Sequence, residues 1–160
     1  MDKNTLIKQL NLVEHIEGGY FARTYQSQLQ SNERALLTSI YYMLTDDRPI
    51  GHFHMNKSDI LHYFHLGSPM TYLTISPTGQ LDTFTLGSDI TKGHVLQQVV
   101  PGGYWKASIL KQGACGLLSE AVFPGFDYHD MTIAKPDELR SQFPHLWDKI
   151  SRYVKTDVDL

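Results

Sequence analysis

Cysteine is nearly absent from this sequence. Cys115 is the single cysteine among 160 residues, so a disulfide framework within the chain is excluded. Its neighbours Gly113, Ala114 and Gly116 are small, and this setting predicts a buried, unreactive thiol. One cysteine also fits a reducing compartment, and we expect a cytoplasmic protein.

Long apolar runs and clusters of basic residues are also missing. No apolar stretch approaches the roughly 20 residues that a membrane-spanning helix needs, and the first ten residues lack the apolar core of a signal peptide. The 14 lysines and arginines are scattered and are balanced by 17 aspartates and glutamates. The sequence therefore predicts neither a membrane segment nor a nucleic-acid-binding surface.

The sequence instead has a series of short strand patterns between two helical ends. Apolar residues with helical spacing near the start, and again after Pro136, predict an N-terminal helix and C-terminal helices. Segments rich in β-formers lie between them and are separated by turns. The length and the lack of repeats or linkers predict one domain over residues 1–160. The fold class that this order predicts is all-β, a jelly roll or small barrel. The main expected strands are 36–44, 60–65, 70–76, 81–86, 95–100, 104–110 and 117–123.

Four of the eight histidines lie in one short segment, between residues 51 and 67. His52 and His54 are two residues apart, so both side chains point to one face of a regular β-strand. Asp59 follows across a turn and could meet them from the next strand. Two histidines and one carboxylate suit a divalent ion such as Fe, Mn, Ni or Zn. A metal site formed by His52, His54 and Asp59 is therefore one prediction.

Strand parity constrains the rest of this segment. Asp59 and Tyr63 share one face of an unbroken strand, while Ile60 and His62 share the other face. Asp59 and His62 can both face the interior only if Asp59 lies in a turn or a bulge intervenes. A turn-capping role for Asp59 is an equally strong interpretation. The sequence leaves open which face of this strand points inward.

The strand pattern and the histidine segment together resemble the cupin superfamily, and most closely its DUF985 (cupin-5) group. That resemblance implies a double-stranded β-helix, a homodimer, and no generally established reaction. Met55, Ile60 and His62 stand where the group carries arginine, glutamate and tryptophan, so its usual pocket carboxylate is missing at that position. The segments that carry the resemblance are residues 12–25, 38–44, 54–67, 99–105 and 122–127.

The resemblance gives mixed signals about a metal. The first motif of metal-binding cupins is similar to His52, His54 and Asp59, with Asp in place of Glu. Their second motif adds a histidine shortly after Pro-x-Gly, and here Pro101-Gly102-Gly103 is followed by Tyr104, Trp105 and Lys106. A protonated lysine cannot coordinate a metal. A cofactor therefore stays an open question at this stage.

A second interpretation needs no metal. The chain resembles, around Glu17 and Arg23, the sugar-nucleotide epimerases of the superfamily, which use a histidine base and a tyrosine acid. His54 or His62 could remove a proton, and Tyr63 could return one. Arg23 could bind a carboxylate or phosphate, although a simple ion pair between Glu17 and Arg23 is a serious alternative.

The prediction that unites these interpretations is a small-molecule site inside the barrel, centred on His54. His62 and Tyr63 are its other candidate catalytic residues. Glu17, Tyr20, Arg23 and Trp105 are expected to orient the ligand. A ligand-binding module without catalysis is the alternative from another functional class.

Overall fold

The structure is a computed structural model that describes residues 2–156. It begins with helix α1 (Lys3–Gln9), as the apolar spacing predicts. Asp2 caps this helix, because its side chain accepts a hydrogen bond from the backbone N–H of Thr5 at 3.2 Å. Leu6 is the residue of α1 that is buried, and it packs below the barrel beside Leu12 and Met43. The apolar face of α1 thus closes one outer surface of the sheet.

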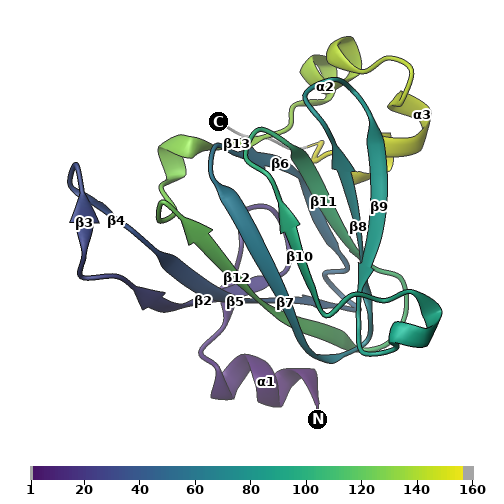
Figure 1. The fold of residues 1–160 in the computed structure, drawn as a ribbon. Coiled ribbons are helices and arrows are strands. Elements are labelled where there is room, and N and C mark those ends of the chain that lie inside the picture. Colours follow the sequence, from purple (N-terminus) through teal and green to yellow (C-terminus); the bar gives the residue numbers. More distant parts are fainter. Residues whose placement is uncertain (1, 157–160) are drawn as a thin grey trace.

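Two antiparallel sheets face each other and form the body of the molecule (Figure 1). This arrangement confirms the predicted all-β double-stranded β-helix. The first sheet contains, in spatial order, β1 (Val13–Glu14), β2 (Tyr20–Gln26), β5 (Thr38–Thr45), β12 (Cys115–Phe123), β7 (Asp59–Gly67) and β10 (Gln97–Val100). The second contains β13 (Met131–Ile133), β6 (Ile50–Asn56), β11 (Trp105–Leu110), β8 (Met70–Ile75) and β9 (Leu81–Leu86).

The C-terminal helices cover the outer face of the second sheet (Figure 1). Pro136 opens α2 (Pro136–Gln142), where its missing N–H costs nothing, and α3 (Trp147–Ile150) follows. Leu139 and Ile150 pack against Phe53 and Trp105 from the sheet. Short 3-10 turns complete the chain: η1 (Ile90–Lys92), η2 (Tyr128–Asp130) and η3 (Ser151–Tyr153). The expected C-terminal helices are therefore present.

A bulge in β6 determines which histidines face the interior. Strand β11 pairs with β6 so that Lys106 is opposite His54, whereas Ser108 is opposite Gly51. One extra residue of β6 is inserted between these two pairs, so the alternation of faces is interrupted at His52 and Phe53. Gly51 and His54 both face inward. A Cβ on Gly51 would lie 2.3 Å from the hydroxyl oxygen of Ser108, inside the barrel.

A two-stranded hairpin, β3 (Gln30–Ser31) and β4 (Arg34–Ala35), projects from the barrel (Figure 1). The side chain of Arg34, in β4, holds the segment 124–130, which follows β12. The Arg34 Nε donates to the Gly125 carbonyl at 2.6 Å, and its Nη1 lies 2.5 Å from Asp130 Oδ2. The Gly125 N–H also donates to the Ala35 carbonyl at 2.8 Å. The hairpin therefore fixes the position of this segment.

The single cysteine is buried, as its small neighbours predict. Cys115 lies at one end of β12, and burial raises the pKa of its thiol. Across the described residues, no helix combines the length and the apolar character needed to cross a membrane.

Candidate active site

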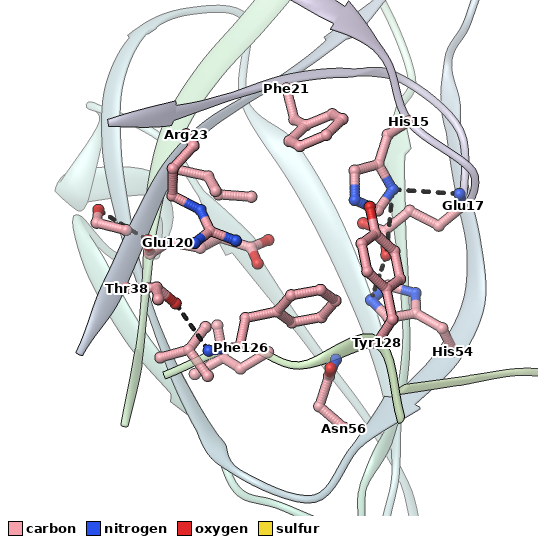
Figure 2. A pocket seen from close by; sticks show the side chains of 14 residues that line it. His15, Glu17, Phe21, Arg23, Thr38, His54, Asn56, Glu120, Phe126 and Tyr128 are labelled. Carbon is pink, nitrogen blue, oxygen red and sulfur yellow. Dashed lines mark hydrogen bonds and ion pairs between the residues drawn. The ribbon is translucent and has the colours of Figure 1, made fainter. Parts of the chain in front are cut away.

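A small cavity lies between the two sheets, under the 124–130 segment (Figure 2). Its volume is about 40 Å³, enough for roughly three or four water molecules. Strands β2, β5, β6, β7 and β12 supply its walls, and most of the lining is apolar. The polar side chains that reach it include His15, Glu17, Arg23, His54, Asn56 and Glu120, and the aromatic ones are Phe21, Phe126 and Tyr128.

Glu17 reaches the cavity from the turn between β1 and β2. Gly18 and Gly19 have positive φ angles of 111° and 70°, which favour glycine. A Cβ on Gly18 would lie 2.1 Å from the Ile50 carbonyl, so only glycine lets this turn lie so close to β6. The Glu17 carbonyl then accepts hydrogen bonds from the backbone N–H of His52 at 2.6 Å and from His52 Nδ1 at 3.0 Å. His52 thus fixes the Glu17 backbone to the sheet.

Glu17 and His54 form a buried pair on the cavity wall. The His54 Nε2 lies 2.8 Å from Glu17 Oε2, and the two residues are 3% and 5% exposed. The other ring nitrogen, Nδ1, lies 2.8 Å from the His52 carbonyl, which can only accept, so Nδ1 carries a proton. The contact between Nε2 and Oε2 therefore needs a second proton. Glu17 and His54 share that proton.

The environment of Glu17 favours its ionised form. Burial alone would raise the pKa of Glu17, but the charge of the neighbouring His54 and the hydrogen bond from it outweigh burial and lower that pKa. The shared proton therefore resides on His54, and the pair is an imidazolium and a carboxylate. His15 accepts the backbone N–H of Glu17 at Nδ1 over 3.2 Å, which leaves its own proton on Nε2.

A second buried cluster lies deeper in the barrel and consists of Lys106, His62 and Glu120. The Lys106 ammonium donates to His62 Nε2 at 2.8 Å and to the two Glu120 oxygens at 3.2 and 3.3 Å. His62 Nδ1 donates to the Gln98 carbonyl at 3.2 Å. Lys106 and Glu120 are 2% and 6% exposed, and His62 is fully buried.

The charges in this second cluster are well defined. Burial, and then the charge on Lys106, lower the pKa of His62, so its ring is neutral at physiological pH. Burial would raise the pKa of Glu120, but the positive charge on Lys106 outweighs burial and lowers that pKa. The cluster therefore contains one ammonium, one carboxylate and one neutral imidazole that accepts from the ammonium.

Two further polar side chains face the cavity without a charged partner. Asn56 is 7% exposed, and its Oδ1 has no hydrogen-bond partner among the described residues. Arg23 is exposed on β2 and lines the cavity on the side opposite to His54 (Figure 2). Its Nη1 donates to the neutral Gln26 at 3.1 Å. The cavity thus has an unsatisfied acceptor in its wall and a guanidinium at its mouth.

A family model matches most of this chain. The Cupin superfamily (DUF985) family covers residues 4–134. The chain belongs to this family. The uncharacterized protein YML079W of Saccharomyces cerevisiae is 40% identical over 155 aligned residues, covering 84% of this chain and 77% of the yeast protein.

Solved structures agree with the family assignment. Protein SO0799 from Shewanella oneidensis superposes with a TM-score of 0.93 at 31% identity and covers 98% of this cupin and 99% of the other chain. A hypothetical protein from Leishmania major gives 0.90 at 29% identity, with coverage of 96% and 99%. Oxalate decarboxylase from Bacillus subtilis has a TM-score of 0.57 at 13% identity, over 90% of this chain and 37% of its own, and shares the fold alone.

The structure brings together some of the predicted site residues of this cupin. Glu17, Arg23 and His54 line one cavity. His62 faces inward, on the face of β7 that it shares with Ile60, but it belongs to the deeper cluster with Lys106.

Three other predicted residues lie away from the cavity. Tyr20 lies under the Arg48 guanidinium on the outer face of the first sheet. Tyr63 is on the face of β7 opposite to His62, which parity explains. Trp105 packs beneath the C-terminal helices. None of these three side chains is placed to orient a ligand or to donate a proton in the cavity.

The predicted metal ligands are not assembled. The bulge in β6 turns His52 toward the outer surface beside Arg48 and Lys155. Asp59 is exposed and accepts the Gly102 N–H at 2.8 Å, which is the turn-capping alternative. Within residues 2–156, no group of three or more His, Cys, Asp and Glu side chains has the geometry of a metal site.

The inward-facing residues do not fit a divalent metal either. The Nε2 of His54 is directed at the Glu17 carboxylate, and the Nε2 of His62 accepts from an ammonium. Lys106 thus supplies the positive charge that Glu120 needs inside the barrel. The Lys106 ammonium is therefore the cation inside this barrel, and the residues around it do not form a metal site.

Several site residues were not predicted from the sequence. Four residues that line the cavity have no site role in the sequence-based predictions: His15, Asn56, Glu120 and Tyr128. The inward position of Glu120 could have been predicted from the sequence. It lies two residues from Leu118 and two from Val122 in an apolar strand, so the three side chains share one face. The position of Tyr128 depends on the contacts that Arg34 makes with the 124–130 segment, and strand patterns carry no such information.

Proposed function

We propose that this cupin binds a small polar molecule in the cavity beside Glu17 and His54. The observation that carries this proposal is the buried pair itself, with its 2.8 Å contact on the wall of a cavity. Burying charged groups is costly, and proteins concentrate such groups at functional sites. Glu17 Oε1 makes no hydrogen bond to a described residue, so this oxygen is available to a ligand donor.

Acid–base chemistry is a second candidate, favoured by the proton shared between Glu17 and His54. Both ring nitrogens of His54 are engaged, so the group that would touch a ligand is the Glu17 carboxylate. Glu17 would accept a proton from the ligand, and His54 would balance the charge. Such proton transfer is the metal-independent chemistry of an isomerase. Glu17 would be the base, a role that the sequence predicted for His54 or His62.

Binding is tested by NMR titration of the isotope-labelled protein with a panel of small sugars, polyols, carboxylic acids and amides. We expect at least one compound to shift the signals of Glu17 and His54. Glu17→Gln is expected to lower the affinity for that compound about tenfold, because the substitution removes a charge-assisted hydrogen bond. Val122→Phe, which fills the cavity, is expected to abolish binding, while Val99→Phe on the exposed face of β10 leaves it unchanged.

The same panel distinguishes catalysis from binding. In D₂O, an acid–base enzyme exchanges the proton next to a carbonyl group of its ligand for deuterium, and a binding module does not. Exchange that is lost in Glu17→Gln would support the second candidate. If no compound in the panel perturbs the cavity signals, or if Val122→Phe binds as well as wild type, the proposed site is wrong.

A further inference from the structure

The cavity has one positive charge without a counter-ion among the described residues. Glu17 is paired with His54, and Glu120 is paired with Lys106, so these four groups balance one another. His15 and His62 each accept a hydrogen bond at one ring nitrogen, so that nitrogen carries no proton and both rings are neutral. Arg23 contacts the neutral Gln26 and forms no ion pair with a described carboxylate. The mouth of the cavity therefore favours a ligand with one negative charge.

The inner part of the cavity offers hydrogen-bond acceptors to a ligand. Asn56 Oδ1 is buried and unpartnered, and Figure 2 shows the carboxamide pointing into the space below Phe126 and Tyr128. Glu17 Oε1 offers a second acceptor nearby on the same lining. Buried acceptors are normally satisfied, so a donor on the ligand or a water molecule is needed here. A hydroxyl group supplies that donor without adding charge.

The walls between these two regions are apolar. Phe21, Ile40 and Phe126 lie along the cavity, whose volume is about 40 Å³. A short carbon chain fits such a surface, whereas a ligand rich in polar groups would leave them without hydrogen bonds. The ligand therefore combines a terminal anion, a short apolar part and a hydroxyl.

We infer that the ligand of this site is a short hydroxycarboxylate with a single negative charge. Its carboxylate pairs with Arg23, and its hydroxyl donates to Asn56 or Glu17. A zwitterionic amino acid is disfavoured, because its ammonium would bring a second positive charge beside the His54 imidazolium. This inference rests on the proposed function, since it names the chemistry of the molecule that occupies the same cavity.

Four probes of nearly equal size separate the contributions of charge and hydroxyl. Lactate has both groups, propanoate lacks the hydroxyl, lactamide lacks the charge, and alanine replaces the hydroxyl with an ammonium. Titration of the full-length protein, followed by NMR, gives a dissociation constant for each. We expect lactate to bind at least about tenfold more tightly than each of the other three.

Two variants assign the contacts. Arg23→Gln is expected to lower the affinity for lactate about tenfold or more and to leave the affinity for lactamide unchanged, because only the charged contact is lost. Asn56→Leu, of similar size, is expected to reduce the difference between lactate and propanoate. Arg140→Gln, on the exposed surface of α2, is the matched control and leaves all four constants unchanged. Amide spectra of each variant verify that it is folded.

The outcomes separate this inference from the proposed function. If alanine or lactamide binds as tightly as lactate, or if none of the four probes binds at millimolar concentration, the hydroxycarboxylate assignment is wrong. A different polar compound that still shifts the His54 signals, and that Val122→Phe excludes, would keep the proposed site intact. Lactate binding that Arg23→Gln does not weaken would also overturn the inference.

Discussion

At the residue scale, the interior of this barrel is organised around two buried ionic clusters rather than around a metal. The sequence predicts Glu17, Arg23 and His54 as members of a site, His54 from its place in the histidine segment and the other two from the resemblance to sugar-nucleotide epimerases. It assigned Lys106 as a lost metal ligand. The structure shows that the Lys106 ammonium is itself the central cation of the deeper cluster. The side chain that breaks the metal pattern is thus the one that completes the cluster.

Removing Lys106 tests this role. In Lys106→Met, Glu120 loses its counter-ion while it stays buried, so we expect the free energy of unfolding to fall by about 3–5 kcal/mol. Lys106→Met combined with Glu120→Leu is expected to recover much of that loss. Lys92→Met, which removes a pair on the surface, is the control and is expected to change stability by about 1 kcal/mol or less. Urea denaturation measures all three. Equal losses for Lys106 and Lys92 would show that the buried cluster is not a stabilising unit.

The neutral state of His62 predicts how stability depends on pH. Its pKa is lowered from 6.5 in the folded state, so below about pH 6.5 the unfolded chain binds a proton that the folded protein does not. The contribution of His62 to stability is therefore fully present above pH 6.5 and declines on acidification, by up to about 1.4 kcal/mol per pH unit. Near pH 4.5, Glu17 and Glu120 add to the decline, since their folded pKa values are also lowered.

The control is His62→Gln, which keeps an acceptor for the Lys106 ammonium but does not titrate. We expect this variant to show a smaller slope between pH 6.5 and 5 than wild type. Chemical denaturation at several pH values gives both slopes. Equal slopes in wild type and His62→Gln between pH 6.5 and 5 would contradict a buried neutral His62.

At the element scale, irregular features decide the site, and these were the hardest to predict. The alternation of residues in β7 and β12 could be read from the sequence and correctly grouped Ile60 with His62. The bulge in β6 could not, because one inserted residue leaves no trace in hydrophobic alternation. It separates His52 from His54, and the predicted metal triad fails for that reason. The hairpin β3–β4 was missed because its strands are only two residues long.

That hairpin is expected to control the segment above the cavity. Arg34→Ala removes the side-chain contacts to Gly125 and Asp130, so the 124–130 segment keeps its backbone hydrogen bonds and the bond from the Phe126 N–H to Thr38 Oγ1 at 2.8 Å. We expect hydrogen exchange of the amides from Gly125 to Asp130 to become at least about tenfold faster, as local opening becomes easier. Arg152→Ala, at the C-terminal end, is the control. Unchanged exchange in Arg34→Ala would show that Arg34 does not hold this segment.

At the scale of the whole molecule, the sequence was a reliable guide to the fold. Short strands with β-forming residues, glycine and proline turns, and apolar spacing at both ends predicted a jelly roll with terminal helices. The family match and the structure confirm that architecture. Strand patterns could not show that Glu120 lies beside Lys106, because the two residues are in different sheets and their contact depends on how the sheets face each other. The cytoplasmic location remains a prediction.

The homodimer also remains a prediction, and the surface supports testing it. Leu29 on the projecting hairpin is 71% exposed and Phe123 is 61% exposed, and a second copy could cover such side chains. We expect light scattering at micromolar concentration to give twice the chain mass of 18.3 kDa. Leu29→Asp is expected to shift the mass toward that of one chain. A wild-type mass equal to a single chain would remove the homodimer from the account.

The central claim is that Glu17 and His54 form a charged pair in the cavity, and the ring nitrogens of His54 report on it directly. Proteins labelled with ¹⁵N-histidine, wild type and Glu17→Gln, can be compared by NMR at neutral pH. We expect both nitrogens of His54 to carry a proton in the wild type, and Nε2 to lose its proton in the variant because the neutral amide no longer stabilises the imidazolium. A wild-type His54 ring with one unprotonated nitrogen, unaffected by Glu17→Gln, would contradict it.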